Sequence, residues 1–174
     1  WEQVTLTSPL FAIKDKQKLS EYITKYKRFI SFTALSERSD IDFGQVLKIA
    51  PDGLYDFNIL IANGKFDVTI EDIIKHHNYN WDWNLLSNIA SLRLTDTFLI
   101  KYINKDWDWR ALTKRDVNKL WSSARLLTMM ASNEHISKQV DWYTITSRCY
   151  FPISTDLLLL IKDKDVNWEA ISRN

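Results

Sequence analysis

The stretch that decides the fold is Trp81-Asp82-Trp83-Asn84-Leu85-Leu86-Ser87, because the chain repeats it. A close copy follows 26 residues later as Trp107-Asp108-Trp109-Arg110-Ala111-Leu112-Thr113. Further copies begin at Val140 and Val166, and weaker ones at Ile30 and Tyr55. We call the third residue of each copy its anchor; with a partial first copy, the anchors are residues 1, 32, 57, 83, 109, 142 and 168. Internal repeats of this kind are typical of arrays in which each unit packs on its neighbours.

Each complete copy carries the signals of a helix start. Asp, Asn or Ser precedes the anchor, and its side-chain oxygen can accept from backbone N–H groups that the first helical turn leaves unpaired. The residue before this cap and the residue three after the anchor are both apolar, as in a hydrophobic staple. We therefore predict a helix, named helix A, that begins at every anchor. We also expect Trp83, Trp109, Trp142 and Trp168 to be mostly buried.

A second helix, named helix B, is predicted before each anchor. Apolar pairs recur ten and nine residues before an anchor, as Tyr22-Ile23, Ile73-Ile74, Leu99-Ile100 and Leu158-Leu159. Thr69-x-x-Asp72 resembles a capping box, and Ser154 precedes Leu157 where a cap belongs. The segment 116–139 departs from this pattern, because its repeat is 33 residues long and has Ser132-Asn133 at the place of the apolar pair.

These patterns predict an all-α fold without a sheet, built as an α-solenoid of about 26-residue helix-hairpin repeats. Residues 1–174 are expected to form one helical-repeat segment. The first and last copies keep the ordinary apolar pattern, with Val4 and Leu6 at one end and Trp168 and Ile171 at the other. Because a solenoid needs polar caps at its ends, we expect the repeats to continue on both sides in a longer protein.

The units Trp81 to Ser87 and Trp107 to Thr113 have the form W-D-W-x-x-L-[ST]. This form resembles tandem repeats found in large uncharacterised proteins of bacteria and giant viruses. The resemblance is sharpest over residues 81–113 and 140–173 and implies an α-solenoid. It transfers no catalytic residue, because a scaffold pattern and not an active site defines that group.

Composition narrows the classes of function. The formal net charge is only +1, whereas a dedicated binder of duplex DNA usually carries a large basic excess. Cys149 is the sole cysteine, which favours a reducing compartment, and the longest apolar runs are far too short to span a membrane. We therefore expect a cytoplasmic protein with no membrane association.

The motifs predict no enzyme, no cofactor and no metal site. His76 and His77 are adjacent, so on a helix they point about 100° apart and rarely share a metal. The capping Asp residues recur one repeat apart, too far to share a proton or metal. The Ser and Thr residues that close the copies have no candidate base at motif spacing. No phosphate loop or nucleotide fingerprint is present.

The sequence instead favours a non-catalytic scaffold or binding module within a larger protein, with a protein partner or neighbouring domains of the same chain. Candidate partner-binding residues lie in the irregular segment, where Met is adaptable: Trp121, Met129 and Met130. The alternative is a nucleic-acid-binding accessory region of a nuclease or helicase. Its candidate contacts are Lys101, Lys105, Arg110, Lys114, Arg115, Lys119 and Arg125.

Overall fold

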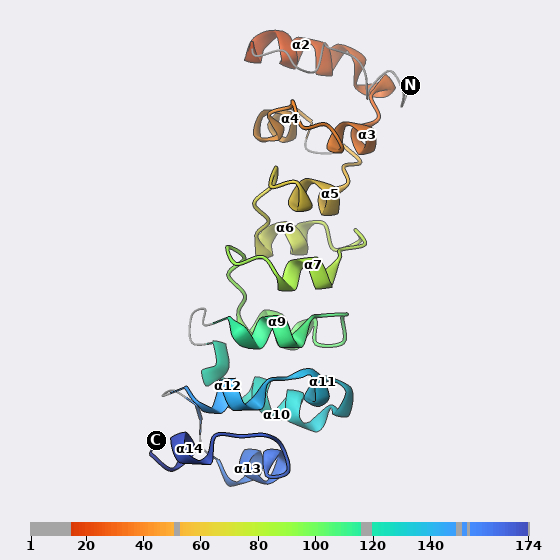
Figure 1. Cartoon of the computed structure of the whole chain (residues 1–174). Helices are drawn as coiled ribbons and strands as arrows, with labels where there is room; N and C mark the ends of the chain where they lie inside the picture. The colour runs from red at the N-terminus through yellow and green to blue at the C-terminus, as the bar shows by residue number, and fades with distance from the viewer. Residues whose placement is uncertain (1–14, 51–52, 116–119, 149–150, 153, 174) are drawn as a thin grey trace. The chain divides into compact units, whose positions relative to one another are not determined.

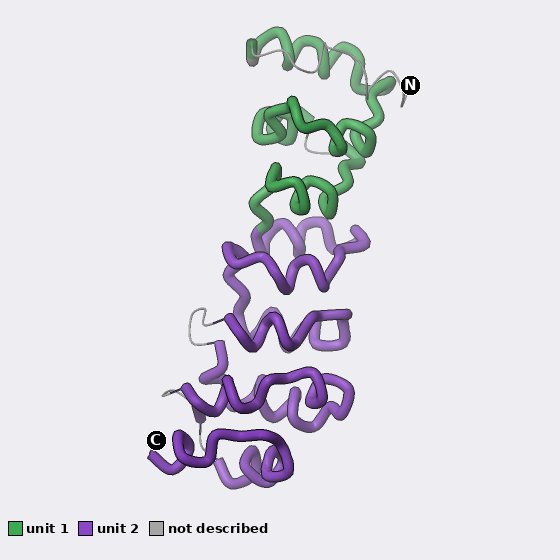
Figure 2. Tube along the Cα trace, viewed as in Figure 1, with its two compact units in different colours: residues 1–68 green, residues 69–174 purple. Residues whose placement is uncertain are grey.

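The computed structural model describes residues 15–50, 53–115, 120–148, 151–152 and 154–173. Throughout these residues the ordered elements are helices and no strand is present, as the sequence predicts. The chain divides into two compact units, Trp1–Val68 and Thr69–Asn174 (Figure 2). The prediction of one continuous segment stays a prediction. The expected anchor at Trp1 lies outside the described residues.

Unit 1 contains two pairs of packed helices. Helix α2 packs against α4, and α3 packs against α5. Because α3 and α5 both start at an anchor, like helices contact like helices in this unit. The elements are α2 (Lys16–Tyr26), the 3-10 helix η2 (Lys27–Phe29), α3 (Phe32–Ser36), α4 (Phe43–Ile49) and α5 (Phe57–Ala62).

Unit 2 repeats this arrangement over more copies (Figure 1). The anchor helices contact one another in the order α7, α9, α12 and α14, and helix α10 contacts both α8 and α13. The unit therefore has one row of A helices and one row of B helices. Its helices are α6 (Ile70–Lys75), α7 (Trp83–Ser87), α8 (Asp96–Lys101), α9 (Trp109–Lys114), η3 (Leu120–Ser122), α10 (Ala124–Ser132), α11 (Glu134–Gln139), α12 (Trp142–Thr146), α13 (Thr155–Ile161) and α14 (Trp168–Ser172).

The predicted caps are confirmed at every described anchor. Each cap has an extended or near-extended backbone, and its side-chain oxygen accepts from the backbone N–H three residues later. The caps are Ser31, Asp56, Asp82, Asp108, Asp141 and Asn167. Among the B helices, Thr69 and Asp72 form the predicted reciprocal capping box, and Ser154 caps α13.

The apolar residues on either side of the cap form the core. The residue three after the anchor is buried in every described copy, and the residue before the cap is buried in all but Ile30, which is partly exposed. Trp81 and Trp107 have a second role that the sequence pattern does not show. Their indole N–H groups donate to the carbonyls of His76 and Tyr102, at 3.1 and 3.0 Å, which satisfies the end of the preceding B helix.

The four anchor tryptophans start helices as predicted, but they are not equally buried. Trp109 and Trp142 are 2% and 3% exposed, Trp83 is partly exposed, and Trp168 is 48% exposed. The prediction of a buried Trp168 is therefore wrong. Trp83 is covered by the next copy, since its ring lies 5.2 Å from Tyr102 and 4.9 Å from Trp107 between centroids. Trp168 begins α14, the last helix that the structure describes, so the described residues contain no following copy to cover its ring.

A hydroxyl group joins consecutive copies. At Ser36, Ser87 and Thr146, the hydroxyl four residues after an anchor donates to the anchor's carbonyl and accepts from the backbone N–H of the next copy's cap. Thr113 differs, since its hydroxyl donates to the Arg110 carbonyl. Ser87 Oγ lies 2.8 Å from the Trp83 carbonyl and 3.0 Å from the Asp108 nitrogen. Equivalent pairs of bonds hold Ser36 to Asp56 and Thr146 to Asn167. We call this link the hydroxyl clasp. Through it, the final residue of the motif connects its own helix to the next copy.

Replacing Ser87 by alanine is expected to destabilise the protein by about 1–2 kcal/mol. Ser87 is fully buried, so its removal leaves the Asp108 N–H without its acceptor inside the fold. Chemical denaturation followed by circular dichroism measures the change. Ser172→Ala is the matched control, because Ser172 occupies the same motif position but is exposed and should change stability by less than about 0.5 kcal/mol. Equal losses in the two variants would contradict the clasp.

The irregular unit after Trp109 contains extra helical turns. Its described residues form η3, α10 and α11, and α11 supplies the turn that leads to Asp141. Trp121 is completely buried, and its indole N–H donates to the Arg115 carbonyl at 2.9 Å. The predicted B-helix pair is replaced by buried Leu126 and Leu127, which lie earlier in the unit. The seven extra residues therefore add a short helix.

Candidate binding grooves

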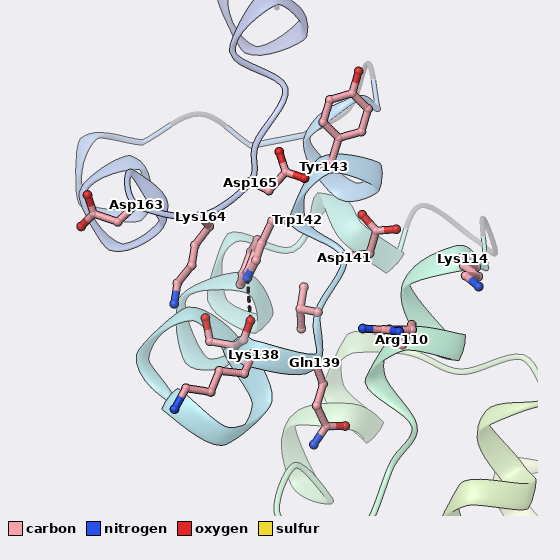
Figure 3. A pocket seen from close by; sticks show the side chains of 12 residues that line it. Arg110, Lys114, Lys138, Gln139, Asp141, Trp142, Tyr143, Asp163, Lys164 and Asp165 are labelled. Atoms are coloured by element: carbon pink, nitrogen blue, oxygen red, sulfur yellow. Dashed lines mark hydrogen bonds between the residues drawn. The ribbon is translucent and has the colours of Figure 1, made fainter.

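Two neighbouring grooves open in unit 2, where the end of a B helix turns into the next A helix. The larger, groove 1, has a volume of about 640 Å³ (Figure 3). Its walls come from α9, from the end of α11 and the start of α12, and from the turn that follows α13. The residues are Arg110, Lys114, residues 137–143, Asp163, Lys164 and Asp165.

Groove 2 has a volume of about 340 Å³ and shares Gln139 with groove 1. Amide side chains contribute to its walls, from Asn84, Asn104 and Gln139, together with the imidazole of His135. The Gln139 amide nitrogen lies 3.0 Å from the His135 Nε2 atom. An amide both donates and accepts, so this lining suits a ligand that presents alternating N–H and C=O groups.

The two grooves are built from equivalent positions of successive copies. Asn84 in groove 2 and Arg110 in groove 1 each follow an anchor by one residue. Lys105, Lys138 and Lys164 each precede an anchor by four residues. Lys105 lines groove 2, and the other two line groove 1. Lys105 and Lys164 lie in the turns that follow α8 and α13, whereas Lys138 lies in the last turn of α11. We call these three residues the lysine row.

Charge is mixed in groove 1, with cations in slight excess. Four basic side chains face three carboxylates across its walls. The Asp141 carboxylate is engaged as the cap of α12, where it accepts from the backbone N–H and hydroxyl of Thr144 at 2.9 and 2.8 Å. In Figure 3 the Arg110 guanidinium points toward the middle of the groove, whereas the Asp163 carboxylate points away from Trp142. The Asp165 carboxylate also lines the groove, so both signs of charge are present in its walls.

The partner-binding residues predicted from sequence do not form an exposed patch. Trp121 and Met130 are completely buried, and Met129 is partly exposed on α10. Trp121 and Met130 therefore pack in the core, where a partner cannot touch them unless the unit opens. The reason is that the seven-residue insertion brings its own apolar side chains, which the fold uses to fill the space between copies.

The basic residues predicted to touch nucleic acid are dispersed. Arg110 and Lys114 line groove 1, and Lys105 lines groove 2 with its ammonium 5.7 Å from the Trp83 ring centroid. Lys101 and Arg125 are exposed on the B helices α8 and α10, outside both grooves. Lys119 lies outside the described residues.

Arg115 is used inside the fold and does not contribute to a basic surface. Its guanidinium donates to the backbone carbonyl of Ser87 at 3.3 Å and to that of Leu92. Burial lowers the pKa of this side chain. Arg148, six residues after its anchor like Arg115, donates in the same way to the Thr113 carbonyl at 3.0 Å. We call these two residues the arginine clamps.

Neither the clamps nor the lysine row was identified from sequence. The sequence does contain a signal for each set. Arg38, Arg115 and Arg148 each follow an anchor by six residues, and the three lysines each precede an anchor by four. Both positions lie outside the seven-residue motif, where the copies otherwise diverge. Only the contacts distinguish an arginine that holds the fold from a lysine that lines a groove.

No known protein family, curated protein or solved structure matches this chain.

Across the residues that the structure describes, His, Cys, Asp and Glu side chains do not gather in threes as a metal site requires. Burial, followed by the charge of Lys75, lowers the pKa of His76. Cys149 lies outside the described residues. In the described helices, no segment is both long and apolar enough to cross a membrane.

Proposed function

We propose that the chain is an α-solenoid of helix-hairpin repeats, of the W-D-W-x-x-L-[ST] kind quoted above, that acts as a non-catalytic binding module for protein partners. The observation that carries this proposal is that, within each copy, different positions build the fold and line the grooves. The repeated positions are used inside the fold, as caps, core residues and hydroxyl clasps. Beside repeated residues such as Trp142, the grooves are lined by positions that differ between copies, such as Asn84 and Arg110. Constant scaffold residues with a variable lining are what a repeat-built binding surface requires.

The two rows of helices in unit 2 support the solenoid part of the proposal. A helices pack on A helices and B helices on B helices, so each copy buries its apolar side against the copies before and after it. The clasps and clamps act between consecutive copies and would hold such an array in register. A surface that repeats with the copies follows directly from this packing.

A protein partner fits the grooves better than nucleic acid does. Carboxylates of Asp141, Asp163 and Asp165 lie in the walls of groove 1, where they would repel a phosphate backbone. One of the basic residues proposed for phosphate contact, Arg115, is turned into the fold. Amide side chains in groove 2 match the hydrogen-bonding groups of a polypeptide.

Site-specific photo-crosslinking tests this function. Tyr143 is 51% exposed and lines groove 1, so p-benzoylphenylalanine at this position should form adducts with proteins from the cells that make the chain. The same group at Phe29, which is 48% exposed in unit 1, is the control. We expect adducts specific to position 143 that disappear when Arg110→Glu and Lys164→Glu are added.

Adducts that are equal at both positions, or that the double substitution leaves unchanged, would refute a partner-binding role for groove 1. Nuclease-sensitive adducts at position 143 would favour the nucleic-acid alternative. Circular dichroism of the double variant has to match that of the parent chain, so that a loss of adducts reports the surface and not unfolding.

A further inference from the structure

We infer that the passage from unit 1 to unit 2 is a hinge, because the residues there cannot form either of the two links that join consecutive copies. The two links are the hydroxyl clasp and the arginine clamp. The copies concerned are those anchored at Phe57 and Trp83, and the boundary between the units falls between Val68 and Thr69. The inference rests on these links and does not depend on what the grooves bind.

Within the units, each junction between described anchor helices has at least one link. The clasp of Ser36 joins α3 to α5, and that of Thr146 joins α12 to α14. The α7–α9 junction has both links. At the α9–α12 junction the Thr113 hydroxyl bonds within its own helix, but the Arg148 clamp reaches the Thr113 carbonyl. A side-chain hydrogen bond therefore crosses all four of these junctions.

Where the chain changes from one unit to the other, isoleucines occupy the clasp and clamp positions. The residue four after Phe57 is Ile61, whose side chain has no hydrogen-bonding atom. It is only 8% exposed, so it fills the buried place that a hydroxyl-bearing side chain takes in other copies. The residue six after Trp83, where the next copy has Arg115, is Ile89. The chemistry of these two side chains therefore excludes both links.

The backbone that crosses the boundary is short and irregular. Helix α5 ends at Ala62, and Gly64 follows with a φ of 64°, a left-handed conformation that commonly ends a helix. Residues 65–69 have no regular structure, and the capping box of Thr69 then starts α6. A hinge needs only a few residues at the ends of elements to absorb changes in dihedral angle. We place the hinge at residues 65–69.

Spin-label distance measurements on the full chain test the hinge. Cys149, the sole cysteine, is replaced by serine throughout, and labelled cysteines are introduced at two exposed positions, Lys48 of unit 1 and Lys101 of unit 2. A second pair, Lys101 and Arg125, lies within unit 2 on the packed helices α8 and α10 and is the reference for a fixed arrangement. We expect a broad distribution of distances for the 48–101 pair and a narrow one for the reference pair.

Ile61→Thr should restrict the hinge, because it supplies the hydroxyl that forms the clasp in other copies. Thr146 shows that threonine can form this link. The matched control is Ile61→Val, because valine has the shape of threonine without the hydroxyl. One added hydrogen bond should lower the population of displaced arrangements by about fivefold, so the 48–101 distribution should narrow in the threonine variant and not in the valine variant.

Ile89→Arg tests the second link independently of the buried position 61. Ile89 is partly exposed, so a longer side chain can be accommodated there. The new guanidinium should reach back to the preceding copy as Arg115 does and narrow the 48–101 distribution. Ile89→Lys is the control, because one ammonium does not reproduce the planar fork of donors. Circular dichroism has to show that each variant is as helical as the parent chain.

Narrowing by Ile61→Thr or by Ile89→Arg, beyond that of its control, supports the inference. A 48–101 distribution as narrow in the parent chain as that of the reference pair would overturn it, because the junction would then be fixed without either link. Failure of both substitutions to narrow the distribution beyond their controls would also overturn it. The measurements report distances and not partner binding, so their outcome is separate from that of the proposed function.

Discussion

Replacing Trp109 by alanine is expected to lower the free energy of unfolding by about 3–5 kcal/mol. Its indole ring is only 2% exposed, and the residue begins α9 in the middle of unit 2. Truncation removes the apolar contacts and leaves a cavity that the surrounding side chains fill only in part. Denaturant unfolding followed by far-ultraviolet circular dichroism measures the loss without depending on tryptophan fluorescence.

Two comparisons make this expectation specific. Trp168→Ala changes the same residue at the same motif position, but that ring is 48% exposed, so the loss should be below about 1 kcal/mol. Asp108→Ala removes the cap of the same helix and should cost about 1 kcal/mol. If Trp168 proved as costly as Trp109, or the cap more costly than the anchor, the assignment of these positions would be wrong.

Arg115→Ala is expected to destabilise the chain by about 2–3 kcal/mol, the second largest effect among these changes. Its guanidinium donates to the carbonyls of Ser87 and Leu92, which lie more than 20 residues earlier. Hydrogen bonds from a charged donor contribute more than neutral ones, and the truncation leaves part-buried carbonyls without this donor. Equilibrium unfolding in urea measures the change.

Arg110→Ala is the control for Arg115, since Arg110 is exposed one residue after the same anchor and should change stability by less than about 0.5 kcal/mol. Arg115→Lys should recover less than half of the loss, because a single ammonium does not reproduce the planar fork that reaches two carbonyls. Full rescue by lysine would show that charge alone matters and would contradict the clamp geometry.

The helix starts can be predicted from the sequence because their signals are local. A cap acts on an N–H group three residues away, so Asp108 before Trp109 specifies a helix start without reference to the rest of the chain. The same holds for Thr69 and Asp72, which form their box within a single turn. The recurrence of these signals predicts an all-α repeat, and the described residues are all-helical.

The residues of the candidate site are harder to predict from sequence, because the exposure of a side chain depends on which other copies pack against it. Met130 was expected at a surface on the ground that Met is adaptable, yet it is fully buried. Arg115 and Arg110 belong to the same basic cluster in sequence, but one is drawn into the fold by two carbonyls and the other lines a groove. Residue type alone cannot separate such cases.

The sequence by itself determined where each helix begins and which residue caps it, since both depend on neighbours within one turn. Only the tertiary structure decided which anchors are covered, which hydroxyl meets which backbone N–H, and where the grooves open. Ser87 meets the N–H of Asp108 across 21 residues, and Gln139 joins two grooves whose walls come from three different copies. Those relations arise when one copy packs on the next, and a pattern read within a single copy contains no record of that packing.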